Sequence, residues 1–137
     1  MLYRLMYCST GNNISEEELG VIRDASTTNN SADGITGLLA YSNNFFLQSL
    51  EGSAKSINHV FARIQKDPRH SDVFILLYSP IVTRMFDSFE MHIITETELT
   101  KKIFFKYSSG PAFNPYEFDP QAGELLLAEL HDNHKKC

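Results

Sequence analysis

The order of helix-type and strand-type segments limits this 137-residue chain to a small set of folds. Two segments have helical periodicity, and apolar strand-type segments precede and follow each of them. The first helix is expected to begin after Ser15, because Ser15 and Glu18 form a capping box. The second helix carries an apolar stripe from Ile57 to Ile64 and is expected to end before Pro68, which disfavours a helical conformation in the preceding residue.

Five segments are predicted to be strands: 2–8, 35–41, 45–51, 73–79 and 86–94. Residues 73–79 are apolar almost throughout, which is typical of a buried strand. The resulting order (strand, helix, strand, strand, helix, strand, strand) is that of ferredoxin-like α+β folds, in which both helices cover one face of the sheet. This plan places the first and third strands side by side at the centre, so Tyr7 and Gln48 are expected to lie close together.

The part of the chain after residue 95 is predicted to cover the other face of the sheet. We therefore divide the chain into a core, 1–95, and a C-terminal helical extension, 96–137, within one globular unit. The apolar residues of the extension suit two helices, each with one buried face: Ile103, Phe104, Tyr107, Leu125, Leu126, Leu127 and Leu130. Pro120 suits the start of the last helix, and Lys135 and Lys136 suit its end.

Composition and charge argue against several classes of protein. Twelve basic and seventeen acidic residues give a net charge of −5, and the basic residues form no stripe, so a nucleic-acid partner is not expected. The longest apolar run, from Val73 to Tyr78, is too short to span a membrane. The two cysteines, Cys8 and Cys137, form no disulfide framework or metal pattern. The sequence therefore predicts a cytoplasmic protein with no membrane partner.

The familiar catalytic and metal-binding motifs are absent from the sequence. There is no Walker loop and no GxGxxG, HExxH or GxSxG motif. His131 and His134 have a spacing that a metal would accept, but solvated side chains at a fraying helix end are the favoured interpretation. Cys8 has no neighbouring base, so a buried small hydrophobe is favoured over a nucleophile. We predict no metal site and no enzymatic activity.

Polar residues stand where a core should be apolar. Asn29 and Asn30 end the first helix, and by themselves they need no functional explanation, because Asn commonly terminates helices. Gln48 is different, since strand alternation places it with Phe46 and Leu50. Either that face is partly wet, or the glutamine is buried and needs hydrogen-bond partners. A tyrosine phenol and a planar heterocycle with carbonyl and imide edges would supply them.

Four sequence blocks resemble a known family. In order and spacing, residues 2–9, 29–37, 46–52 and 62–70 resemble the BLUF domain, a blue-light sensor that uses FAD. The resemblance extends from residue 2 to about residue 94, and the extension is similar to the two C-terminal helices of short, stand-alone BLUF proteins. The resemblance implies a non-catalytic flavin photoreceptor that holds FAD between its two core helices.

The resemblance implies that a hydrogen-bond switch carries the photochemistry. Tyr7 matches the phenol that gives an electron and a proton to the excited flavin. Gln48 matches the amide between this phenol and the N5/O4 edge of the flavin, which rearranges and strengthens its bond to O4. Met91 is similar to a methionine on the last strand that contacts the glutamine. Phe89 replaces the family's usual tryptophan and lacks an indole N–H, so signalling by movement of that tryptophan does not transfer to this chain.

The resemblance also implies a set of cofactor-binding residues: Asn29, Asn30, Gln48, Ile35, Ile64, Arg63, Lys66 and Arg69. An amide carries both a donor and an acceptor, so Asn30, together with Asn29, suits the pyrimidine edge of the flavin. The two isoleucines are expected beside the ring, although their spacing is equally consistent with an ordinary core. The three basic residues are candidates for phosphate contact, and solvated side chains near a helix end are an equal alternative.

Three functions from different classes are compared. A flavin photoreceptor explains the glutamine, the asparagine pair and the missing catalytic motifs together, and its signal is expected to pass to a separate protein effector or to a homo-oligomer. An acylphosphatase-like hydrolase shares the broad fold, but it needs an arginine-bearing loop after the first strand, which residues 8–13 do not provide. A ligand-free ferredoxin-like interaction module needs only the leucines of the extension.

Overall fold

The computed structural model describes residues 1–136, with side chains as far as Asn133. In chain order the elements are β1 (Leu2–Gly11), α1 (Glu16–Ala32), β2 (Thr36–Ser42), β3 (Phe45–Gly52), α2 (Ala54–Lys66), β4 (His70–Ile81), β5 (Phe89–Ile93), α3 (Glu98–Tyr107), the 3-10 helix η1 (Pro115–Glu117) and α4 (Pro120–Lys136). The side chains of His134, Lys135 and Lys136, and the whole of Cys137, lie outside the described residues, so what was predicted for them stays a prediction.

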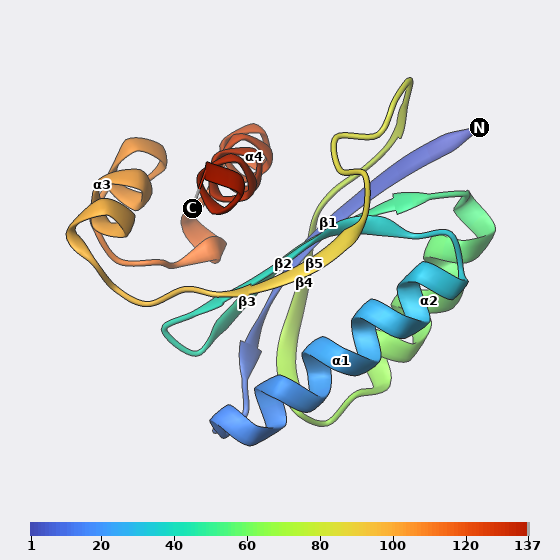
Figure 1. The fold of residues 1–137 in the computed structure, drawn as a ribbon, viewed down its shortest axis with the longest axis horizontal. Coiled ribbons are helices and arrows are strands. Elements are labelled where there is room, and N and C mark those ends of the chain that lie inside the picture. Colours follow the sequence, from blue (N-terminus) through green and yellow to red (C-terminus); the bar gives the residue numbers. More distant parts are fainter. Residues whose placement is uncertain (137) are drawn as a thin grey trace.

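A five-stranded sheet separates two pairs of helices (Figure 1). The strand order is β4-β1-β3-β2-β5, and neighbouring strands are antiparallel except β2 and β5, which are parallel. Helices α1 and α2 cover one face, and α3 and α4 lie over the other (Figure 1). The predicted ferredoxin-like α+β fold is therefore confirmed, as is the central position of the β1–β3 pair.

Local sequence accounts for where α1 and α2 begin and end. Ser15 Oγ accepts a hydrogen bond from the Glu18 N–H at 3.1 Å, and the Glu18 side chain accepts one from the Ser15 N–H at 3.4 Å, which completes the predicted capping box. Ser53 caps α2 by accepting from the Ser56 N–H at 3.1 Å. Helix α2 ends two residues before Pro68, as expected. These caps position the two helices whose facing surfaces form the candidate site.

The alternation of side chains along β1 gives the sheet two separate cores. Leu5 and Tyr7 pack under α1 and α2, whereas Met6 and Cys8 pack under α3 and α4. Cys8 is fully buried, which confirms its interpretation as a small core residue. Burial raises the pKa of the Cys8 thiol to about 11, so the group is a thiol and not a nucleophilic thiolate at neutral pH.

Strand β4 differs from the prediction of a buried strand. Phe74, Ile75 and Tyr78 are 58%, 47% and 43% exposed. The strand order explains the difference, because β4 is an edge strand that pairs with β1 on one side within the described part of the chain. An apolar run alone does not distinguish a central strand from an edge strand, so this prediction was wrong.

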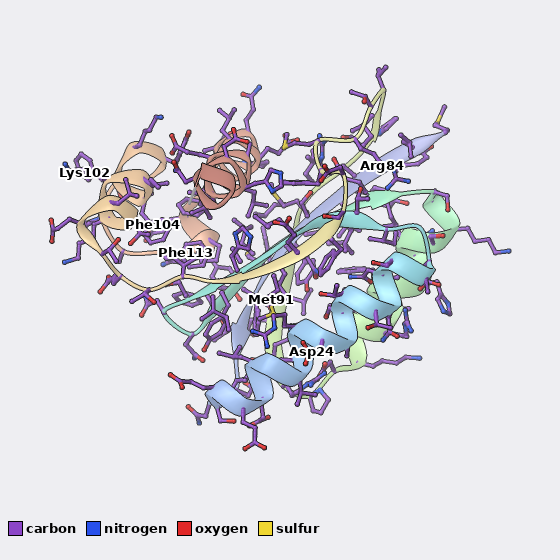
Figure 2. All side chains as sticks on the ribbon, in the orientation of Figure 1. Asp24, Arg84, Met91, Lys102, Phe104 and Phe113 are labelled. Carbon is purple, nitrogen blue, oxygen red and sulfur yellow. The ribbon has the colours of Figure 1, made fainter. Side chains whose placement is uncertain are left out.

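The extension covers the second face of the sheet as predicted. Phe104 of α3 and Phe113 of the following loop are buried and lie between α3 and the sheet (Figure 2). Leu126 and Leu127 of α4 are fully buried in the same core. Leu125 was expected in the buried set, but it is 55% exposed because it lies on the outer side of α4.

His131 was predicted to be solvated, and the structure shows it buried. Its Nδ1 lies 3.3 Å from Glu90 Oε2 on β5, because the last turns of α4 pack against the sheet. The described histidines, cysteines and acidic residues include no group of three that is arranged to hold a metal ion. Within residues 1–136, no helix has both the length and the apolar character needed to cross a membrane.

Candidate functional site

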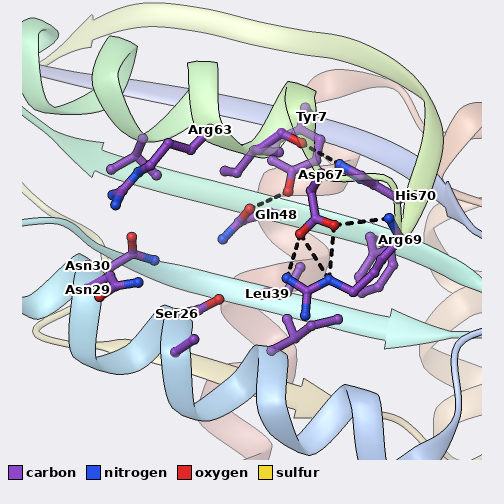
Figure 3. Close-up of a pocket in the computed structure, with 15 residues that line it drawn as sticks. Tyr7, Ser26, Asn29, Asn30, Leu39, Gln48, Arg63, Asp67, Arg69 and His70 are labelled. Carbon is purple, nitrogen blue, oxygen red and sulfur yellow. Dashed lines mark hydrogen bonds and ion pairs between the residues drawn. The ribbon is translucent and has the colours of Figure 1, made fainter.

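A cavity of about 190 Å³ lies between α1, α2 and the sheet (Figure 3). Its walls come from both helices, and its floor comes from the central strands. Seven of the residues predicted from the sequence line it: Tyr7, Asn29, Asn30, Gln48, Arg63, Ile64 and Arg69. Residues from four separate stretches of the chain therefore meet at one place.

Tyr7 and Gln48 form the polar centre of this cavity. They are opposite each other in the β1–β3 pair, which confirms their predicted proximity. The Tyr7 O–H donates a hydrogen bond to Gln48 Oε1, and both side chains are buried. Burial raises the pKa of the Tyr7 phenol well above its ordinary value of 10, and the negative charge of Asp67 raises it further. Tyr7 is therefore a protonated donor at neutral pH.

The hydrogen bond from Tyr7 leaves one end of the Gln48 amide for another partner. Because Oε1 accepts from the phenol, the amide nitrogen Nε2 is the end that can donate to a ligand. Figure 3 shows the nitrogen-bearing end of Gln48 pointing into the space between α1 and α2. The glutamine is thus a buried, oriented amide with a donor directed into the cavity.

A row of residues crosses the sheet at the floor of the cavity. Tyr7 of β1 pairs with Gln48 of β3, Gln48 pairs with Leu39 of β2, and Leu39 pairs with Met91 of β5. Directly opposite residues in neighbouring strands share a face of the sheet. Met91 points from β5 towards α1 (Figure 2). Leu39 therefore lies between Gln48 and Met91, a step that the sequence did not indicate.

The asparagine pair lies in the last turns of α1. Asn30 is buried and Asn29 is exposed, and both line the cavity. The Asn30 C=O accepts a hydrogen bond from the Ile35 N–H at 2.8 Å, which ties the end of α1 to the start of β2. The two side-chain amides face Gln48 across the cavity (Figure 3). Amides therefore lie on both sides of the space.

Two ion pairs lie at the rim of the cavity. Arg63 of α2 donates to Asp33 at 3.1 Å, and Arg69 donates to Asp67 at 2.6 Å. Hydrogen bonding from Arg69 lowers the pKa of Asp67 below its usual value, so Asp67 is a carboxylate at neutral pH. Each predicted phosphate-binding arginine thus already has an acidic partner, which a phosphate would have to share or displace.

His70 is a cavity residue that was not identified from the sequence. Its Nδ1 lies 2.8 Å from Ser9 Oγ, and its Nε2 lies 2.6 Å from the Ile64 C=O. The ring also packs edge-on against Tyr7 and Phe46. The signal that could have found it is its position a few residues after α2, at the first residue of the strand that pairs with β1, which carries Tyr7.

Three predicted residues lie away from the cavity wall. Ile35 is buried at the start of β2 and packs against Gly52. Lys66 is exposed in the last turn of α2, and Met91 lies on β5 beyond Leu39. The roles assigned to these three residues stay predictions.

Residues 2–92 match the BLUF family model, which is described as "Sensors of blue-light using FAD". The chain belongs to the BLUF family. BLUF domains bind a flavin. The matched segment ends in β5, so it contains every element that lines the cavity.

Solved BLUF structures extend the similarity. BlsA in its photo-activated state superposes with a TM-score of 0.83 at 30% identity, covering 95% of this chain and 94% of BlsA. BlsA in its ground state gives a TM-score of 0.79 at 32% identity and covers 95% of this chain and 87% of BlsA. BlrB, a BLUF protein in its dark state, gives 0.64 at 32% identity over 68% of this chain and 71% of BlrB. The likeness to BlsA thus includes the C-terminal helices.

Longer proteins also contain BLUF sequence similar to this chain. Photoactivated adenylate cyclase subunit beta of Euglena gracilis is 36% identical over 134 residues, which is 92% of this chain. Subunit alpha of the same organism is 34% identical over 140 residues, which is 96% of this chain. The chain spans only 16% and 14% of the length of these two relatives.

The cavity of this BLUF protein fits a flavin in the chemistry of its lining. Ile22, Val60 and Ile64 give apolar walls for an aromatic ring system. The amides of Asn30 and Gln48 carry donors and acceptors that match carbonyl and imide edges. These residues would hold the ring, with Tyr7 next to the glutamine.

Proposed function

We propose that this BLUF protein is a non-catalytic blue-light photoreceptor that binds FAD and switches by a rearrangement of the Tyr7–Gln48 hydrogen bond. One observation carries the proposal: the Tyr7 phenol donates to the buried Gln48 amide, whose other end points into the cavity. When bound, the flavin supplies blue-light absorption and an excited-state electron acceptor. The other groups of the switch are side chains of this protein.

Tyr7 supplies an electron and a proton in this mechanism. Its raised pKa keeps the phenolic proton in place until the electron leaves. An oxidised phenol is strongly acidic, and Gln48 Oε1, which already accepts its hydrogen bond, is placed to receive the proton. Gln48 then exchanges the ends of its amide, by rotation or tautomerisation. The electron and the proton return to Tyr7, and the rearranged neutral amide presents a different hydrogen-bonding pattern to the ligand. The stored signal is this changed pattern.

The other cavity residues hold the cofactor in the proposal. Asn30 and Asn29 bond the pyrimidine edge, and Ile64 packs beside the ring. Arg63 and Arg69 bind the phosphates by sharing their present partners, Asp33 and Asp67. Their planar guanidinium groups suit phosphate oxygens. Liquid chromatography of the flavin released on denaturation tests the cofactor, with FAD as the expected species and FMN or riboflavin as the result that would contradict it.

The signal leaves through the C-terminal helices in this proposal. Helices α3 and α4 cover the face of the sheet opposite the cavity, so a change in the strands alters how they pack. A different packing changes the surface offered to a separate protein effector or to a second copy of this chain. If the binding free energy of that partner differs by about 1–3 kcal/mol between the two packings, its affinity would change by roughly 5–150-fold.

The decisive experiment replaces the switching amide. Gln48→Leu should still bind flavin, because the volume is kept, but it should lose the small red shift of the illuminated absorption spectrum. Gln65→Leu is the matched control, since Gln65 is exposed on α2, and it should shift normally. A normal light-induced shift in Gln48→Leu would refute the assigned switch. A purified wild-type protein that is colourless and does not bind added flavin would instead support a ligand-free interaction module.

A further inference from the structure

Among the described side chains, polar groups of α4 contact the sheet at two places, and the two contacts differ in their distances and number of partners. Glu124 lies near the start of the helix and contacts β1. His131 lies two turns later and contacts β5. Between them the contacts are apolar, through residues such as Leu127. The polar contacts therefore tie the two parts of the helix to different strands.

The first attachment is built on the buried carboxylate of Glu51. Glu51 is fully buried on β3 and accepts four hydrogen bonds: from Arg4 Nη2 at 2.7 Å, Met85 N–H at 2.8 Å, Thr36 Oγ1 at 3.1 Å and Phe86 N–H at 3.1 Å. These donors come from β1, from β2 and from the loop between β4 and β5. A carboxylate with this many partners from separate elements is held in one position.

Arg4 connects Glu51 to α4. Its second terminal nitrogen, Nη1, donates to Glu124 Oε2 at 2.7 Å, so the guanidinium bridges two carboxylates. Such charge-assisted hydrogen bonds are short and directional. Beside this contact, Gly123 packs so closely on Met6 that an added Cβ would lie 3.1 Å from Cε. The start of α4 is therefore closely fitted to β1.

The second attachment is looser. His131 Nδ1 lies 3.3 Å from Glu90 Oε2, and His92 Nε2 lies 3.1 Å from the same oxygen. Both distances are longer than those around Arg4, and one oxygen serves two rings. Strand β5, which carries Glu90, has five residues and pairs with β2 at the edge of the sheet. The same strand carries Met91 at the end of the row that begins at Tyr7.

We propose that Arg4 is a positioning residue that makes the start of α4 a fixed pivot, so that light moves the part of α4 beyond Glu124. The proposal rests on the proposed photoreceptor function. The row from Tyr7 through Gln48 and Leu39 reaches β5, where Glu90 holds His131. A displacement of β5 therefore moves the part of α4 that carries His131. The hydrogen bonds of Arg4 to Glu51 and Glu124 keep the start of the helix in place.

Hydrogen exchange of the flavin-loaded full chain, in darkness and under continuous blue light, tests the pivot. We expect light to change exchange by about 5-fold or more in β5 and in residues 126–133, and by less than 2-fold in residues 120–125. In Glu124→Leu, which removes the acceptor of Arg4 Nη1 but keeps the Arg4–Glu51 pair, the change should spread to residues 120–125. Glu129→Leu is the matched control on the same helix, because Glu129 pairs with Lys106 of α3, and it should keep the wild-type pattern.

The outcomes separate this inference from the function on which it rests. Equal light-dependent changes in both halves of wild-type α4 would overturn the pivot, and so would an unaltered pattern in Glu124→Leu. A normal red shift with unchanged exchange throughout α4 would also overturn the pivot alone. Loss of the red shift in the wild-type protein would overturn the photoreceptor function itself. If Glu124→Leu does not fold, the comparison of residues 120–125 with residues 126–133 in the wild-type protein still tests the pivot.

Discussion

Tyr7 obtains its chemical character from groups that are remote in sequence. Gln48 Oε1, on the neighbouring strand, accepts a hydrogen bond from the phenolic O–H, and His70 and Phe61 pack around the ring of Tyr7. Burial and the charge of Asp67 together disfavour ionisation of the phenol. At the scale of the residue, the site is thus a phenol kept neutral beside a buried amide that accepts its hydrogen bond.

The raised pKa of Tyr7 predicts how stability depends on alkaline pH. Above about pH 10 the unfolded chain loses this phenolic proton, whereas the folded chain keeps it. The unfolded state then binds fewer protons, so the free energy of unfolding falls as pH rises above 10, by up to about 1.4 kcal/mol per pH unit from this group. Urea unfolding between pH 9 and 12 measures the slope, and Tyr7→Phe should make it shallower. Equal slopes in the two proteins would contradict the burial argument.

The pairing of β2 with β3 depends on a glycine. Gly37 has φ +151°, and a Cβ built on it would lie 1.9 Å from the Ser49 carbonyl oxygen. No side chain fits there unless the strands move apart. The same two strands bring Leu39 beside Gln48, so the geometry of the switch depends on this close approach.

We expect Gly37→Ala to destabilise the protein by about 3 kcal/mol or more, because both the backbone conformation and the contact with Ser49 are lost. It should also weaken flavin binding. Gly110→Ala is the matched control, since nothing lies within 4 Å of its Cβ position, and it should change stability by less than about 0.5 kcal/mol. Urea unfolding and flavin titration measure both effects. Similar stability of the two variants would show that β2 can move away from β3 with no loss of unfolding free energy.

Helix α3 offers two adjacent phenylalanines in opposite environments. Phe104 is 0% exposed beneath the helix, and Phe105 is 63% exposed on its outer side. Phe104→Ala should cost about 3–5 kcal/mol of unfolding free energy through the cavity it leaves, whereas Phe105→Ala should cost less than about 0.5 kcal/mol. Thermal or urea unfolding tests the pair. Equal effects would mean that α3 does not pack on the sheet in solution as it does in the structure.

For the molecule as a whole, the sheet has an apolar surface on both faces. One face is covered by α1 and α2, and the other by the extension. The residues covered by the extension include Met6, Cys8, Leu38, Ala40 and Leu47, all fully buried. The core and the extension are therefore joined by a hydrophobic interface, through which the proposed change in the strands would reach the helices.

Truncation after Glu96 tests whether the extension is needed to cover this face of the sheet. Removing the extension bares a contiguous apolar face, so the shortened chain should aggregate and bind a hydrophobic dye such as ANS, while the full chain should not. Size-exclusion chromatography and dye fluorescence measure the outcome. A shortened chain that stays monodisperse and dye-free would mean that the extension contributes little to covering the core.

The sequence predicted most of the elements because their signals are local. The capping box of Ser15, the stripe ending before Pro68 and the alternation along β1 each depend on residues a few positions apart. Gln48 was recognisable for the same reason, as a polar residue in an apolar strand. The position of Tyr7 beside it followed from the order of the strands.

The remaining features were decided by tertiary structure, since they depend on which distant segments become neighbours. Strand β4 is apolar but exposed because it occupies an edge of the sheet. His131 is buried because α4 reaches β5, and Leu39 separates Gln48 from Met91 because β2 lies between their strands. The bridge of Arg4 between Glu51 and Glu124 joins positions up to 120 residues apart. Periodicity determines which way a side chain faces, whereas packing alone determines what it meets there.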